Sequence, residues 1–145
     1  FLLDLLIKNH IEAHLEQGEE QSLCGGKLLI RKYHNRGAFL DVGEKKQKAV
    51  AFLSLLLTLF MTVAFLATFS MRGNSTLRAG LALLLGGAYS NTYDRLTRKY
   101  VVDYVSFPVK NKRIRRIVFN ISDFCIIIGA LLMTLGESQR VKKKK

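Results

Sequence analysis

Residues 117–135 read IVFNISDFCIIIGALLMTL, and this stretch decides the fold. It is apolar and nearly long enough to cross a bilayer core as a helix, which takes about 20 residues. Asp123 is its one charged residue. A carboxylate in hydrocarbon costs at least about 2.5 kcal/mol, so Asp123 needs a partner or a function. Asp103, which follows the preceding apolar span, is the candidate partner, and two carboxylates at one membrane edge predict paired-carboxylate chemistry.

The composition of the chain combines apolar and basic residues that are segregated along the sequence. The 145 residues carry a net charge of +12, yet 49% of them are hydrophobic. A second stretch, 49–71, has no charged residue, and the basic residues lie between the apolar stretches. This pattern predicts one integral membrane domain whose loops contact anionic lipid headgroups, with no nucleic acid as a partner. Cys24 and Cys125 are expected at different depths, so no disulfide is predicted.

The order of apolar and polar segments predicts an all-α membrane protein with four transmembrane helices. Gly25, Gly26 and several β-formers in the first loop predict a small extramembrane β element at the membrane surface. A segment lying in the membrane interface is expected before the last helix. A tight turn at 72–75 joins the second and third spans. The segments are the end of a truncated first span (1–14), a loop with the β element (15–48), span two (49–71), span three (76–93), a loop with the interfacial segment (94–116), span four (117–135) and a basic tail (136–145).

Span three has two features of its own. Small residues at Ala82, Gly86 and Ser90, four residues apart, predict a ridge that another helix can approach closely. The last turn is polar and places Asn91, Asp94 and Arg95 on one face of the helix.

Four blocks of the sequence resemble those of the lipoprotein signal peptidases (signal peptidase II), in the order of that family. FNISD at 119–123 resembles its FNxAD block, and GGA at 86–88, followed by Asn91, Asp94-Arg95 and VVD at 101–103, resembles its third block. NRGAF at 35–39 resembles the NxGAAF block, and Asp4 and Lys8 match the D-x-x-x-K block.

The resemblance implies a four-span aspartyl endopeptidase of the bacterial inner membrane. It implies a substrate that is a lipid-modified prolipoprotein, whose signal peptide is cut off after its cysteine has received a diacylglyceryl group. The implied catalytic pair is Asp103 and Asp123, with no cofactor and no metal. The implied supporting or substrate-binding residues are Asn35, Asn91, Arg95, Asn120, Asp4, Lys8 and Gly37.

The chain also departs from the pattern of this family. None of the departures removes a catalytic carboxylate, and they lie at loop and helix-packing positions, so they bear on substrate recognition more than on chemistry. They are Ser90 and Lys99 in place of glycines, Ser122 in place of Ala, Leu5 in place of Gln, and Phe39 one position early.

The supporting residues have expected roles. Two neighbouring carboxyls resist double ionisation, so the pair holds one proton and titrates as a unit. Asn120 lies one helical turn before Asp123 and is expected to orient it. Asn91 is expected to do the same for Asp103. Arg95 is expected to pair with Asp94 or with a nearby carbonyl oxygen.

Several alternatives stay open at this point. For Asp4 and Lys8, an ion pair between residues four apart is favoured over a role in the site. Residues 35–37 fit a turn as well as a site. The spacing of His10 and His14 does not fit a zinc-protease motif, because Glu must directly follow the first His. The alternative functions are a non-catalytic lipid- or lipopeptide-binding membrane protein and a transporter subunit with a proton relay at Asp123.

The orientation in the membrane has two conflicting indicators. The two long loops carry more Lys and Arg than the turn and the tail on the other side, which favours a cytoplasmic location for these loops. The resemblance places them outside, with the active site near the outer leaflet. We follow the resemblance, because it rests on several independent blocks.

Overall fold

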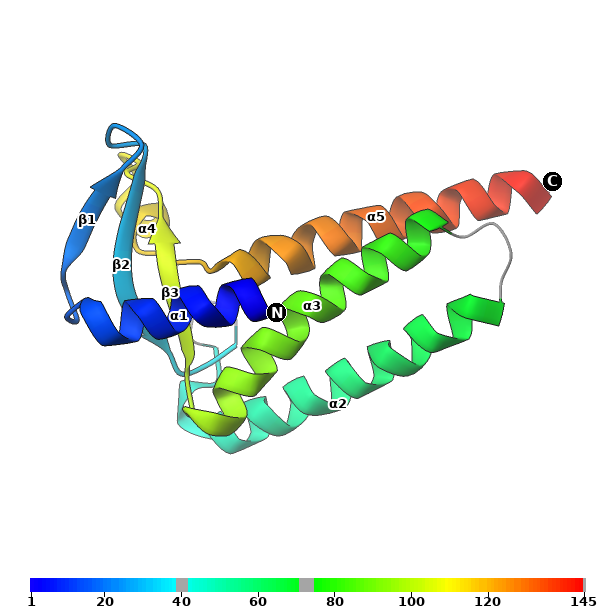
Figure 1. Cartoon of the computed structure of the whole chain (residues 1–145), viewed down its shortest axis with the longest axis horizontal. Coiled ribbons are helices and arrows are strands. Elements are labelled where there is room, and N and C mark those ends of the chain that lie inside the picture. The colour runs from blue at the N-terminus through cyan, green and yellow to red at the C-terminus, as the bar shows by residue number, and fades with distance from the viewer. Residues whose placement is uncertain (39–41, 71–74, 145) are drawn as a thin grey trace.

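Three long helices form the body of the computed structural model, which describes residues 1–38, 42–70 and 75–144. They are α2 (Gln47–Ala67), α3 (Ser75–Thr97) and α5 (Ile121–Lys144). All three extend from a small sheet at one end of the molecule, where α1 (Leu2–His14) also lies (Figure 1). Helix α3 packs against both α5 and α2. The short helices are η2 (Glu44–Lys46), η3 (Thr68–Ser70) and α4 (Lys112–Arg115).

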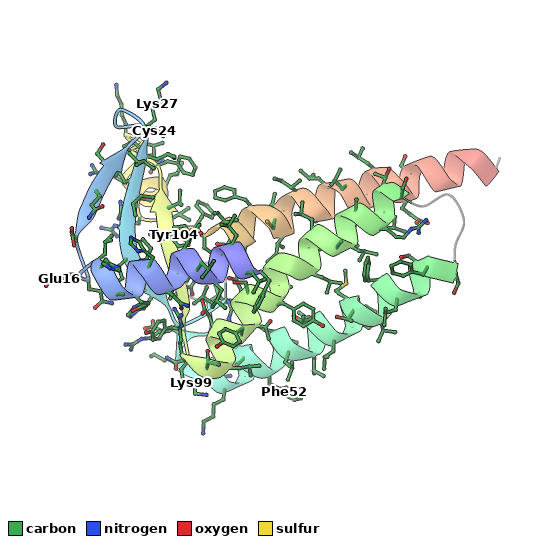
Figure 2. All side chains as sticks on the ribbon, viewed as in Figure 1. Glu16, Cys24, Lys27, Phe52, Lys99 and Tyr104 are labelled. Carbon is green, nitrogen blue, oxygen red and sulfur yellow. The ribbon has the colours of Figure 1, made fainter. Side chains whose placement is uncertain are left out.

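Two helical stretches in the described part are long and apolar enough to cross a membrane, Glu44–Ser70 and Ile121–Ser138. Only 6% of the most apolar window of Glu44–Ser70 is buried, and Phe52 points outward from α2 (Figure 2). The core helix of a soluble protein would bury such side chains, whereas a lipid-facing helix exposes them. The predicted spans 49–71 and 117–135 therefore each coincide with a helical stretch that is long and apolar enough to cross a membrane. The spans predicted over 1–14 and 76–93 stay predictions.

The last helix begins later than the predicted span. Residues 117–119 are not helical, because Phe119 pairs with Val105 through two backbone hydrogen bonds of 2.7 Å that extend the sheet. Helix α5 starts at Ile121, which places Asp123 in its first turn and not deep in a transmembrane helix. The helix then continues to Lys144, through most of the stretch predicted as a basic tail. The predicted turn at 72–75 lies largely outside the described residues.

The predicted β element is present, and it is larger than expected. Strands β1 (Glu20–Leu23) and β2 (Leu28–Asn35) form a hairpin. A third strand, β3 (Val101–Ser106), comes from the second long loop and pairs antiparallel with β2. Five of its six residues are buried, so β3 has no alternation of polar and apolar residues that would identify it as a strand in a small surface sheet. Helix α1 packs on it, and Ile11, Leu15, Val102 and Tyr104 form a buried cluster.

The close contact between α3 and α5 is made by glycines other than those of the predicted ridge. A Cβ on Gly80 would lie 2.7 Å from Met133 N, and one on Gly129 would lie 2.6 Å from Gly80 O. Ala82 of the predicted ridge is exposed, and Gly86 faces the start of α1. Of the predicted ridge, Gly86 and Ser90 therefore face α1, where Ser90 Oγ donates to Asp4 Oδ2, and only Ala82 lies outside a helix contact. The helices do meet at small residues, as is typical of helices in membranes.

Lys99, labelled in Figure 2, makes the turn between α3 and β3, and its Nζ donates to Leu96 O at 2.7 Å. Its φ is 72°, a left-handed backbone conformation that favours glycine. Glycine is also the residue usual at this position in the family that the sequence resembles. Of the other departures, Phe39 lies outside the described residues.

Candidate active site

Asp103 is held on β3 by two amide side chains. The carboxyl group is 2% exposed. Asn35, at the end of β2, donates from Nδ2 to Asp103 Oδ2 at 3.1 Å, and Asn120 donates from Nδ2 to Asp103 Oδ1 at 2.7 Å. Burial, together with the negative charge of Asp123, raises the pKa of Asp103 to about 8. Ionisation of both carboxyl groups is therefore disfavoured at neutral pH.

Asp123 is fixed by the way in which α5 begins. The backbone N–H of Asn120 donates to Asp123 Oδ2 at 3.0 Å, and the backbone N–H of Asp123 donates to Asn120 Oδ1 at 2.9 Å. This reciprocal pair is a capping box made of Asn and Asp. Asn91 on α3 adds a third hydrogen bond, from Nδ2 to Asp123 Oδ1 at 2.9 Å. The FNISD block therefore caps a helix and sets the direction of a carboxyl group at the same time.

The predicted partners of the two asparagines are only partly right. Asn91 was expected to orient Asp103, but its side chain donates to Asp123, because α3 packs closely along α5. Asn120 does orient Asp123, as expected, and its side-chain amide also reaches Asp103. A single residue therefore contacts both carboxyl groups.

The loop after β2 is a turn and also part of this site. Asn35 Oδ1 accepts from the backbone N–H of Gly37 at 3.1 Å, while Asn35 Nδ2 binds Asp103. Arg95 donates to Gly37 O at 3.1 Å and to Asn91 O at 3.4 Å. The guanidinium thus binds carbonyl oxygens, one of the two kinds of partner predicted for it, and connects the loop to α3.

Asp4 and Lys8 form the predicted ion pair, with 2.9 Å between Lys8 Nζ and Asp4 Oδ2, but it is buried within a larger network. Lys8 Nζ also lies 3.0 Å from Asp94 Oδ2 and donates to Asn91 Oδ1 at 2.9 Å. Because Asn91 Oδ1 faces Lys8, its NH₂ group faces Asp123. Lys8 therefore determines the orientation of an amide that binds the dyad. The Lys8–Asp94 pair could not be predicted from the sequence, because the two residues lie on different helices.

Both aspartates line one cavity of about 660 Å³. Its other described lining residues are mainly apolar, and those from α2, α5 and the segment before α5 include Leu57, Phe119 and Ile126. Further lining residues come from β2, the loop after β2, α3 and β3. Arg116 lies at the same cavity and was not predicted as a site residue, since it sits in a run of basic residues without a motif. The arrangement offers an acidic pair to a polar group, next to walls suited to hydrocarbon.

Comparisons with known proteins show the family and agree with the fold. A family model described as Signal peptidase (SPase) II matches residues 1–137. The chain is 31% identical over 150 residues to the lipoprotein signal peptidase of Caldicellulosiruptor bescii, covering 99% of this chain and 93% of that protein. It is 34% identical over 142 residues to the lipoprotein signal peptidase of Brucella ovis, covering 94% and 82%.

Two solved structures share the fold, both described as a bacterial membrane enzyme structure obtained by the in meso method. One, at 2.3 Å resolution, has a TM-score of 0.80 and 23% identity, covering 99% of this chain and 85% of that one. The other, at 1.9 Å, has a TM-score of 0.76 and 24% identity, covering 92% and 84%. The fold and the family match together define a membrane peptidase. The chain belongs to the signal peptidase II family.

Proposed function

We propose that this protein is an aspartyl endopeptidase of the bacterial inner membrane that removes signal peptides from diacylglyceryl-modified prolipoproteins. The observation that carries the proposal is the double contact of Asn120 with Asp103 and Asp123 at the wall of one apolar cavity. Membership of the signal peptidase II family and the names of its relatives support the choice of substrate. The active site is proposed to lie near the outer leaflet.

The proposed mechanism uses the shared proton of the dyad. The pair holds one proton at neutral pH, since burial and the negative charge of Asp123 disfavour the ionised form of Asp103. The ionised carboxylate takes a proton from a water molecule, which attacks the scissile carbonyl carbon. The protonated carboxyl donates to the carbonyl oxygen, and a proton then passes to the leaving amine as the C–N bond breaks. We assign the one-proton state to the pair and not a fixed role to either acid.

The cavity wall supports a lipidated substrate. Leu57, Ile126 and Ile127 line it beside the dyad, and acyl chains of a diacylglyceryl group bury favourably against such side chains. Arg95 lines the same cavity, but its guanidinium binds carbonyl oxygens of the protein. We therefore propose that Arg95 and Asn35 shape the site, and that Asn91 and Asn120 hold the two carboxyl groups.

The test is cleavage of a diacylglyceryl prolipoprotein by purified protein in detergent. Asp103→Asn and Asp123→Asn should each abolish cleavage while the protein stays folded and membrane-embedded, because neither variant retains two ionisable groups. Glu12→Gln is the matched control, since Glu12 pairs with His34 and Lys32 on the sheet side, away from the dyad. Full cleavage by either Asp variant would refute the dyad. Binding of the lipidated substrate without turnover by wild type would favour a non-catalytic lipopeptide-binding protein.

A further inference from the structure

The carboxylate of Asp4 gathers three buried hydroxyl groups. Asp4 Oδ2 accepts hydrogen bonds from Ser90 Oγ and Ser122 Oγ, both at 2.6 Å, and Oδ1 accepts one from Tyr104 Oη at 2.8 Å. All four residues are at most 2% exposed. None of the three hydroxyl residues is among the described residues that line the cavity of the dyad. Their role is therefore not direct contact with a substrate in that cavity.

Each hydroxyl lies next in sequence to a residue of the dyad or its support. Ser122 precedes Asp123 on α5, and Tyr104 follows Asp103 on β3. Ser90 precedes Asn91 on α3, whose amide binds Asp123. One carboxylate on α1 thus connects the three elements that carry the catalytic groups.

Tyr104 strengthens this connection at the start of α5. Its hydroxyl donates to Asp4 and accepts from the backbone N–H of Ile121 at 3.2 Å. This N–H belongs to the first turn of α5 and has no acceptor within the helix. Any movement of α5 relative to β3 therefore strains the hydrogen bonds that connect Ile121 through Tyr104 to Asp4. Tyr104 is labelled in Figure 2.

The two serines are departures from the family pattern described above, in which Gly and Ala are usual and neither carries a hydroxyl. Their convergence on one oxygen atom gives the departures a common physical role. We infer that Ser90, Ser122 and Tyr104 are positioning residues of this enzyme, which act through Asp4 to hold α3, α5 and β3 in the relative placement that the dyad requires. This inference rests on the proposed peptidase function.

The inference predicts an effect on turnover and not on substrate binding. The hydroxyls lie behind the catalytic groups and outside the cavity lining, so their loss leaves the binding surface in place. A small displacement of Asp123 relative to Asp103 lowers kcat, because acid–base catalysis depends on the placement of the groups.

The experiment compares Ser90→Ala/Ser122→Ala with wild type for cleavage of a diacylglyceryl prolipoprotein. We expect kcat to fall about tenfold or more, because misplaced groups slow catalysis strongly, with KM changed less than about twofold. Alanine is used at position 90 to avoid the flexibility that glycine adds to a helix. Thr58→Val is the matched control. It removes a buried hydroxyl on α2 that bonds Ser54 O and Thr92 Oγ1 instead of Asp4, and it should leave kcat unchanged.

A double-mutant cycle with Asp4→Asn tests whether the hydroxyls act through Asp4. In that background the two serine substitutions should lower kcat further by less than about twofold, because residues that act as one unit are not additive. Additive effects, or a wild-type kcat in Ser90→Ala/Ser122→Ala, would overturn the inference. If the double variant does not fold, Ser122→Ala alone and Tyr104→Phe carry the same expectation for kcat. Inactive dyad variants alongside fully active serine variants would refute this inference alone, whereas active dyad variants would refute the peptidase proposal.

Discussion

Two adjacent glycines of α3 offer a direct test of how helix packing places the dyad. A Cβ added to Gly87 would lie 2.3 Å from Ser122 O and 2.9 Å from Ile126 Cγ1, both on α5. A Cβ added to Gly86 would have Phe1 N as its nearest atom, at 3.8 Å. Gly87→Ala and Gly86→Ala therefore make the same chemical change one residue apart, with and without a collision.

The expected difference in stability follows from these distances. The Gly87 contact falls about 1 Å short of the 3.4 Å at which ordinary contact begins, and the opposing atom is a backbone carbonyl oxygen that cannot rotate away. Such overpacking costs about 1–3 kcal/mol. Alanine in a helix gains about 0.5–1 kcal/mol over glycine, but both variants share this gain. Gly87→Ala should therefore be less stable than Gly86→Ala by about 1–3 kcal/mol.

The collision also reaches the active site. Ser122 directly precedes Asp123, so α5 must shift next to the residue that carries one of the two proposed catalytic carboxyl groups. A displacement of about 1 Å lowers the rate about 100-fold, while Gly86→Ala should keep wild-type turnover. The assays are thermal unfolding in detergent and kcat for a diacylglyceryl prolipoprotein. Equal unfolding temperatures and equal kcat values for the two variants would refute the reasoning about helix contact.

Two further predictions concern pH and the turn at Lys99. Because burial and Asp123 raise the pKa of Asp103 from 3.8 to about 8, the one-proton state is lost above that pH, and kcat/KM for prolipoprotein cleavage should fall above about pH 8. Between these pH values the raised pKa makes the folded state bind more protons than the unfolded state, so the unfolding temperature should decrease as the pH rises. The decrease should be smaller in Asp103→Asn. A loss of cleavage and of stability only on the acid side would contradict both expectations. Lys99→Gly should stabilise the fold by about 0.5 kcal/mol, since relief of about 1 kcal/mol of left-handed strain exceeds about 0.5 kcal/mol of added chain entropy. Thermal unfolding against Lys99→Ala, which keeps the strain, checks this, and a lower unfolding temperature for Lys99→Gly would argue against it.

The sequence was sufficient to predict the features that depend on local pattern. The apolar stretch 49–71 predicted a membrane-spanning helix, and the β-formers and glycines of the first loop predicted a small β element. The pairing of Asp103 with Asp123 was predicted from their common position at the ends of apolar stretches, and the structure brings both to one cavity. Each of these predictions uses the residue types along a stretch of the chain, so none of them requires knowledge of how the helices pack.

The features that could not be predicted depend on contacts between elements that are far apart in the sequence. VVDYVS was not assigned to the sheet, because burial on both faces removes the alternation that marks a surface strand. The partner of Asn91 was predicted wrongly, because it depends on which face of α3 meets α5, and glycines at 80 and 87 set that face. The start of α5 was placed too early, since Phe119 is apolar enough for a span but pairs with β3.

The placement of Lys8 shows how a cation can lie near an acidic dyad without ionising both acids. Lys8 Nζ lies 2.9 Å from Asp4 and 3.0 Å from Asp94, so two carboxylates that are not part of the dyad offset its charge. Its positive charge lowers the pKa of Asp103, but this effect is smaller than the increase caused by burial and Asp123. Lys8 reaches the dyad through the neutral amide of Asn91, whose oxygen it binds and whose NH₂ group binds Asp123. The amide transmits orientation and little charge, so the dyad keeps the shared proton that the proposed chemistry requires.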